Sequence, residues 1–219
     1  MPITSLPGKY GIGCFSKEAY AFIDWLKEAG QTYWQILPIH PTSYGDSPYQ
    51  SFSTFAGNPY FIDLEELIEE GMLTREECDS MDFGDDEDDI DYEDQYQNRY
   101  ILLTMAYERS NISQNPDYQR FVEENRWWLD DYALFMALKT FFNGQCWNEW
   151  PQDIRLRWDY SMDYYRRELY FDIEFQMFLQ FYFFRQYWRL KAYANENHIK
   201  IIGDIPIYVA MDSADTWAH

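Results

Sequence analysis

The stretch IKIIGDIPIYV at residues 199–209 decides the fold class. Its apolar, β-branched side chains are typical of a strand that is buried on both faces of a parallel sheet. A second apolar segment, YWQIL at residues 33–37, ends at Pro38 and is too short for a helix, so we predict another strand there. Two such strands separated by helical sequence predict an α/β protein in which they are parallel neighbours with a right-handed crossover.

Helical patterns fill much of the remaining sequence. Apolar residues at helical spacing follow Ser16 and stop at Gly30, which predicts the first helix. Further helices are predicted at residues 64–70, from Thr74, at 95–109, 117–125, 129–142 and 162–195, and from Ser213. Ser16, Asp63, Thr74 and Ser213 are expected to cap the helices that follow them.

Charge and hydropathy argue against two classes of partner. The sequence has 17 Lys and Arg residues against 38 Asp and Glu residues, which gives a formal net charge of −21. Nucleic-acid binding needs a basic face, and anionic lipid repels an acidic protein. The longest apolar run, within residues 166–189, is interrupted by Gln176 and Gln180 and is shorter than the roughly 20 residues of a membrane helix. We therefore expect neither nucleic acid nor a membrane as a partner.

Aromatic residues make up 21% of the chain, with 9 Trp, 20 Tyr and 16 Phe. Tyr and Trp combine an apolar ring with a polar tip, which suits half-wet surfaces as well as cores. Acidic groups beside exposed rings would recognise a neutral, ring-shaped ligand that is rich in hydroxyl groups. The alternative is that most of these rings pack in an aromatic-rich core.

Cysteine and histidine usage bears on the compartment and on metals. Cys14, Cys78 and Cys146 are odd in number and widely spaced, which fits a reducing compartment, so we expect a cytoplasmic protein. The 3 histidines lie apart from the cysteines and from one another in sequence, so we expect no metal site and no cofactor. The acidic tract DFGDDEDDIDYED at residues 82–94 lacks the spacing of a calcium loop, and we interpret it as a solvated turn.

A long segment rich in Gly, Pro, Ser and Tyr, PTSYGDSPYQSFSTFAGNP, occupies residues 41–59 after the first predicted strand. It has turn residues but no helical period. Loops of this length in compact domains are usually functional. We therefore expect this loop to contribute to a binding site.

The predicted elements divide the chain into three parts. Residues 1–40 hold the first helix and strand, residues 41–198 hold the long loop, a helical insertion and a crossover helix, and residues 199–219 hold the next strand and the beginning of its helix. The middle part is too long for a single crossover. We therefore expect a large helical subdomain inserted between the two parallel strands.

Three segments carry a resemblance to a known family. They are SLPGKYGIG at residues 5–13; WQILP at 34–38 with YGDSPYQS at 44–51 and FAGNP at 55–59; and GDIPIYVA at 203–210 with DSADTW at 212–217. Together and in this order they resemble the 4-α-glucanotransferases of glycoside hydrolase family 77, the amylomaltases or disproportionating enzymes. The resemblance covers essentially the whole chain.

The resemblance implies a (β/α)8 TIM barrel of the α-amylase type with inserted helical subdomains. A complete barrel takes about 250 residues before insertions. We therefore expect a partial barrel, in which residues 1–40 hold a clipped first strand, a helix and the second strand. The C-terminal half of the barrel is missing from the chain and would be its partner.

The resemblance also implies an activity, the transfer of α-1,4-glucan segments between maltodextrins by a retaining mechanism. Such a mechanism uses one carboxylate as nucleophile and one carboxylic acid as acid/base, about 5–5.5 Å apart. The family motifs that supply these groups lie beyond His219. We therefore expect an N-terminal fragment that holds no catalytic residue and is inactive alone.

Substrate-binding roles are implied for residues on both sides of the insertion. The family's Tyr at the position of Tyr49 stacks under a glucose ring, and its Asp at the position of Asp212 accepts hydrogen bonds from sugar hydroxyls. Asp46 and Ser47 shape the same loop, with Ser47 on the acceptor side. The alternatives are that Tyr49 anchors its own loop and that Asp212 caps the helix at Ser213. As substrate-binding residues, Tyr49 and Asp212 should lie near one another on the same side of the sheet.

A free-standing, non-catalytic α-glucan-binding module is the alternative function. Such a module should be compact and self-sufficient. This chain ends just after a helix begins at Ser213, which favours a fragment of the enzyme.

Overall fold

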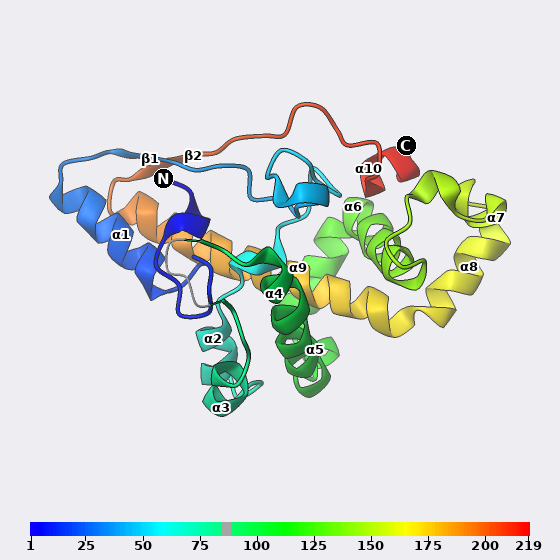
Figure 1. Cartoon of the computed structure of the whole chain (residues 1–219), viewed down its shortest axis with the longest axis horizontal. Helices are drawn as coiled ribbons and strands as arrows, with labels where there is room; N and C mark the ends of the chain where they lie inside the picture. Colours follow the sequence, from blue (N-terminus) through cyan, green and yellow to red (C-terminus); the bar gives the residue numbers. More distant parts are fainter. Residues whose placement is uncertain (85–88) are drawn as a thin grey trace. The chain divides into compact units, whose positions relative to one another are not determined.

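The computed structural model describes residues 1–84 and 89–219. The α-helices and strands follow the order α1 (Lys17–Glu28), β1 (Tyr33–Gln35), α2 (Leu64–Glu69), α3 (Arg75–Asp79), α4 (Tyr92–Asp94), α5 (Tyr100–Arg109), α6 (Pro116–Phe141), α7 (Gln152–Arg155), α8 (Asp159–Glu168), α9 (Tyr170–Glu196), β2 (Lys200–Ile202) and α10 (Ala214–Ala218) (Figure 1). Single 3-10 turns occur at Ile3–Ser5, Tyr44–Asp46, Pro59–Phe61, Ile112–Gln114 and Trp147–Glu149. The predicted solvated turn in the acidic tract falls in part on residues 85–88, which lie outside the described residues.

The two strands are parallel neighbours, as predicted. Tyr33, Trp34 and Gln35 of β1 lie opposite Lys200, Ile201 and Ile202 of β2. Figure 1 shows the two strands side by side although almost all of the helices separate them in sequence. The sequence pattern therefore identified a true long-range pairing.

The second strand is much shorter than predicted. It ends at Ile202, whereas the apolar pattern continues to Val209. The residues that follow are irregular and exposed: Ile205, Ile207 and Tyr208 have 65%, 71% and 89% of their surface accessible. The prediction of a strand over residues 199–209 that is buried on both faces is therefore wrong.

Prolines after both strands limit how far the ladder could extend. Past the strand ends, the bond from the Ile36 amide to the Ile202 carbonyl, at 3.0 Å, extends it on this side. Pro38 and Pro206 follow, and neither has the N–H that a ladder requires. Within the described residues the sheet has only these two strands, so β2 has one paired edge. The strand predicted at residues 33–37 is likewise reduced to β1.

Helix boundaries differ from the prediction in several places. One continuous helix, α6, replaces the two predicted at residues 117–125 and 129–142, since no Gly or Pro interrupts it. The single helix predicted at residues 162–195 is instead two, α8 and α9, which meet at Leu169, where φ is −102° and ψ is 23°. A third difference is smaller: Gln95–Arg99 form a π-helical turn ahead of α5.

Local caps match the sequence well. Asp63 accepts a hydrogen bond from the Glu65 amide at 3.1 Å and begins α2. Thr74 and Glu77 form the predicted capping box of α3. Ser16 is the exception, because its hydroxyl donates to the Glu18 carboxylate at 2.6 Å and does not cap α1.

The chain forms two compact units, and it enters each of them three times. Unit 1 comprises residues 1–39, 58–112 and 182–205, and unit 2 comprises residues 40–57, 113–181 and 206–219. Helix α9 contributes residues to both units. In the part of the chain that the structure describes, no helix is long and apolar enough to cross a membrane.

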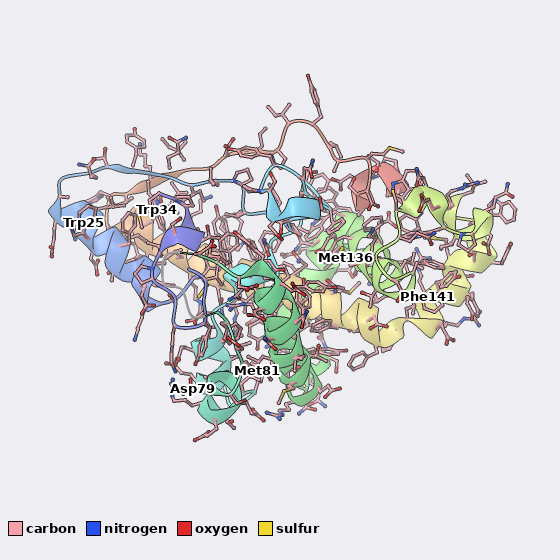
Figure 2. All side chains as sticks on the ribbon, in the orientation of Figure 1. Trp25, Trp34, Asp79, Met81, Met136 and Phe141 are labelled. Carbon is pink, nitrogen blue, oxygen red and sulfur yellow. The ribbon has the colours of Figure 1, made fainter. Side chains whose placement is uncertain are left out.

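Aromatic rings pack in the core of unit 1. Trp34 is 2% exposed and meets the edge of Phe22 on α1 at 5.0 Å between ring centroids. Phe15 packs against Phe61 and Phe183 with centroids 5.4 and 5.2 Å apart. Such pairs contribute about 0.5–1.5 kcal/mol each beyond their buried area. Figure 2 labels Trp34 together with Trp25, an exposed neighbour on α1.

The core of unit 2 is equally aromatic. Phe135 of α6, Trp150 and Trp217 of α10 form a triangle with centroids 5.5, 6.0 and 5.8 Å apart. All three side chains are buried. The aromatic-rich core is thus the correct interpretation for these rings, whereas Trp127 is 66% exposed.

Candidate functional site

The loop that follows β1 forms a closed turn in unit 2. Thr42 and Ser51 pair as an isolated antiparallel bridge at its base. The Ser43 amide donates to the Gln50 carbonyl at 3.0 Å, one step closer to the tip. Because these contacts close the turn at its base, Tyr49 is presented on a defined piece of backbone.

Three of the four predicted substrate-binding residues lie within this turn. Asp46 ends a 3-10 turn that begins at Tyr44, and both Gly45 and Asp46 have positive φ angles, of 74° and 53°. The Ser47 hydroxyl accepts a hydrogen bond from the Tyr49 amide at 3.3 Å. Tyr49 is 44% exposed, and partial burial raises the pKa of the Asp46 carboxyl. The structure thus brings Asp46, Ser47 and Tyr49 together.

The far end of the loop is fixed by the side chains of Gln180, which is buried, and His40, which is partly buried. The Gln180 side-chain amide on α9 accepts from the Gly57 amide at 2.7 Å and donates to the Gly57 carbonyl at 2.9 Å. His40 Nδ1 lies 3.1 Å from the Ala56 carbonyl oxygen, and burial lowers the pKa of His40. A neutral His40 whose Nδ1–H donates to this carbonyl therefore joins the two ends of the loop.

Asp212, the fourth predicted residue, lies between β2 and α10 and is mostly buried. Its Oδ2 accepts from Lys139 Nζ at 2.7 Å, and its Oδ1 accepts from the Trp147 amide at 3.3 Å. The cap of α10 is Ser213, whose hydroxyl accepts from the Thr216 amide at 3.3 Å. The capping alternative for Asp212 is therefore wrong, and its carboxylate takes part in a buried ion pair.

Lys139 is a residue that the sequence analysis missed. Its ammonium group donates to the Gly144 carbonyl at 2.6 Å, to the Gln145 carbonyl at 3.0 Å and to Asp212. An ammonium group has three donors, so these three acceptors satisfy it. The signal in the sequence was a lysine within the apolar stretch ALFMALKTFF of α6.

A second missed residue, Asp215, joins the loop to α10. Its Oδ2 accepts from the Thr54 amide at 2.7 Å, and its Oδ1 accepts from the Ser53 hydroxyl at 3.3 Å. Beside them the Ala214 amide donates to the Phe52 carbonyl at 2.8 Å. These bonds bring together the two segments, far apart in the sequence, that carry the predicted site residues.

The arrangement offers ring stacking and hydrogen bonding. The half-exposed ring of Tyr49 suits stacking, and the carboxylates of Asp46 and Asp212 accept hydrogen bonds. Within residues 1–84 and 89–219, no cluster of three or more His, Cys, Asp and Glu side chains is arranged to hold a metal ion. The shared subsite of Tyr49 and Asp212 stays a prediction.

Known proteins resemble this chain along its whole length. The family model described as 4-alpha-glucanotransferase, glycoside hydrolase family 77, matches residues 1–219. The 4-alpha-glucanotransferase of Clostridium butyricum is 51% identical over 219 residues, which are 100% of this chain and 45% of that protein. The 4-alpha-glucanotransferase of Streptococcus pneumoniae serotype 4 is 48% identical over 221 residues, which cover 100% of this chain and 44% of that protein.

A solved structure shows the same relationship. Amylomaltase from Streptococcus agalactiae, in complex with acarbose, matches with a TM-score of 0.94 at 40% identity, over 99% of this chain and 44% of that chain. The chain thus spans less than half the length of these relatives. The resemblance inferred from the sequence motifs is confirmed, and the chain belongs to glycoside hydrolase family 77, the 4-alpha-glucanotransferase family.

Proposed function

We propose that the protein containing this chain is a 4-α-glucanotransferase, which cleaves an α-1,4-glucan and transfers the released segment to another maltodextrin. The family match over residues 1–219 carries the proposal. The name of a relative that is 51% identical supports it. The acarbose bound to the amylomaltase of Streptococcus agalactiae supports an oligosaccharide as the ligand class.

In this proposal β1 and β2 are neighbouring strands of a partial (β/α)8 barrel. Residues 1–40 hold the beginning of the barrel, residues 41–198 hold the active-site loop with the helical insertion, and residues 199–219 hold the next strand and its helix. The parallel register of β1 and β2 supports this assignment. Barrel enzymes place their active sites in the loops after the strands, which is where Asp46, Ser47 and Tyr49 lie.

This chain would supply substrate-binding groups. Tyr49 would stack its ring against the C–H face of a glucose unit. Asp212, Ser47 and Asp46 would hydrogen-bond sugar hydroxyls. The Asp212 oxygens accept from Lys139 and from the Trp147 amide, and a carboxylate has about four lone-pair sites, so it can also accept from a hydroxyl.

The reacting carboxyl groups would lie outside residues 1–219. In a retaining transfer, a carboxylate attacks C1 of the glucose unit while a carboxylic acid protonates the departing glycosidic oxygen. A hydroxyl of the acceptor glucan then attacks C1, gives its proton to the same acid/base group and releases the nucleophile. No cofactor takes part in this sequence of steps.

A reducing compartment such as the cytoplasm is proposed for this protein. Cys14, Cys78 and Cys146 all carry free thiols. Burial raises the pKa of the Cys14 thiol to about 12 and that of Cys78 to about 11. These two thiols are therefore protonated and unreactive at neutral pH.

The test uses the complete protein and maltotriose. Transfer should yield glucose together with maltodextrins longer than the substrate. Tyr49→Ala should lower kcat/KM by about tenfold or more, and Tyr49→Phe should be milder because the stacking face remains. Acarbose binding without transfer would favour the glucan-binding module, and a protein that neither binds acarbose nor transfers glucose contradicts both functions.

A further inference from the structure

We propose that Asp215 is a positioning residue for the substrate-binding loop. The inference rests on the proposed function, in which Tyr49 contacts the sugar. Asp215 has no role in that proposal. Its side chain nevertheless makes the connection between the loop and α10, through Thr54 and Ser53.

The contacts of Asp215 reach Tyr49 through a short run of backbone. Tyr49 lies within the turn that the Thr42–Ser51 bridge closes, next to Gln50, whose carbonyl accepts from the Ser43 amide. The next residues along the chain are those that contact α10: the Phe52 carbonyl accepts from Ala214 at 2.8 Å, and Thr54 donates to Asp215 at 2.7 Å. The base of the turn is therefore attached to α10 at several consecutive positions.

Asp215 also orients the hydroxyl of Ser53, which bonds to the backbone of the residues that follow it. The Ser53 hydroxyl accepts from the amides of Phe55 and Ala56, at 3.1 and 3.3 Å, while it donates to Asp215. Ser53 is 1% exposed, so its hydroxyl has little access to water as a substitute partner. Removing the carboxylate would leave the Ser53 hydroxyl and the Thr54 amide without this acceptor, so two of the three attachments would be lost and the Ala214–Phe52 bond would remain.

The first measurement compares substrate handling by Asp215 variants of the complete protein. Asp215→Ala should weaken acarbose binding and raise the KM for maltotriose by about tenfold, the size of one lost hydrogen bond to a charged group. Asp215→Asn keeps a side-chain oxygen for the Thr54 amide, so it should recover most of the affinity. The kcat should change less than KM, because Asp215 lies outside the reacting groups.

A double-mutant cycle tests the route through Tyr49. If Asp215 acts by placing Tyr49, Asp215→Ala should cost little further affinity in a protein that already carries Tyr49→Ala. Full additivity of the two changes would overturn the proposal. Equal acarbose affinity in Asp215→Ala and the unchanged protein would overturn it as well.

A matched variant separates positioning from general damage to α10. Ser213→Ala removes the cap of the same helix but leaves the Asp215 contacts in place. It should lower the unfolding temperature as much as Asp215→Ala does and leave acarbose affinity unchanged. A similar loss of affinity in Ser213→Ala would assign the effect to helix stability and overturn the positioning role. If the unchanged protein fails to transfer glucose, the proposed function itself fails.

Discussion

Each unit contains a buried cation, and the two are satisfied in different ways. In unit 1, Arg99 is fully buried, and its Nη2 and Nη1 atoms donate to the Ile62 carbonyl at 2.6 Å and to Gln95 Oε1 at 3.3 Å. In unit 2, Lys139 is 5% exposed and donates to two carbonyls and to the carboxylate of Asp212. The Ile62 carbonyl and the Gln95 side chain are neutral acceptors, whereas Lys139 has a counter-ion in direct contact.

The difference separates two uses of a buried charge. Burial lowers the pKa of Arg99, which means that the site penalises the charged form. Asp63 acts on Arg99 through space and partly offsets that penalty. Lys139 and Asp212 neutralise one another, so each depends on the other. Arg99 therefore stabilises the core of unit 1 through neutral acceptors, whereas Lys139 connects α6 to the segment before α10 through one charged partner, Asp212.

The largest effect is expected when one partner of the ion pair is removed. Lys139→Met leaves the Asp212 carboxylate buried without its cation, which should lower the free energy of unfolding by about 3–5 kcal/mol. Adding Asp212→Asn should recover much of this loss, because no buried charge then remains. Urea denaturation of the unchanged protein, Lys139→Met, Asp212→Asn and the double variant measures both effects. Losses that simply add would show that the pair is not the source of the stability.

Replacing Arg99 should cost less and should resist rescue. Arg99→Met leaves the Ile62 carbonyl without its donor, a loss of about 2–3 kcal/mol. A second change, Gln95→Leu, removes the other neutral acceptor but leaves the backbone carbonyl unpaired, so stability should not return. If Gln95→Leu restores the free energy of unfolding of Arg99→Met in the same urea assay, the predicted difference between Arg99 and Lys139 is wrong.

The acid beside Arg99 gives a pH test of unit 1. Burial raises the pKa of the Asp63 carboxyl to about 6, from an ordinary value of 3.8. The folded state then binds the proton more tightly than the unfolded chain, so stability should fall as pH rises from about 4 to about 6. Asp63→Asn retains the cap of α2, since Asn caps as well as Asp, and should remove this part of the pH dependence. The urea midpoints of both proteins at either end of the interval provide the measurement, and equal slopes would refute the assignment.

The smallest effect should come from a cation at the surface. Lys9 lies 2.8 Å from Asp79, and both side chains are nearly half exposed. Lys9→Met should change the free energy of unfolding by about 0.5 kcal/mol or less, and salt should reduce even this. The loss caused by Lys139→Met should be insensitive to salt. A large effect at Lys9 would mean that burial does not set the order among the three cations.

Features set by neighbouring residues could be predicted from the sequence. The caps at Asp63, Thr74 and Ser213 depend on side chains within one helical turn of the amides they bind. The pairing of the two strands was also recognised, because short apolar segments separated by helices leave few topologies. The loop with Asp46, Ser47 and Tyr49 was found from its turn residues.

Features that depend on distant partners could not be predicted in this way. The segment at residues 199–209 has the side chains of a strand, but within the described residues its paired part is Lys200–Ile202. Nothing in the local pattern indicates that Lys139 meets Asp212, or that Asp215 meets Thr54. Such pairs are set by packing, and only the unusual placement of a lysine in an apolar stretch points toward one of them.

The exposed apolar residues after β2 make the solubility of the chain depend on ionic strength. Ile205, Ile207 and Tyr208 are exposed apolar side chains that follow β2, a strand with one paired edge among the residues that the structure describes. The net charge of −21 keeps copies apart by mutual repulsion. Added salt shortens the reach of that repulsion to about 10 Å at 0.1 M and leaves the adhesion intact. Association of the chain is thus set by attraction between the exposed apolar segments and by repulsion between the net charges. The chain should associate fastest in concentrated salt.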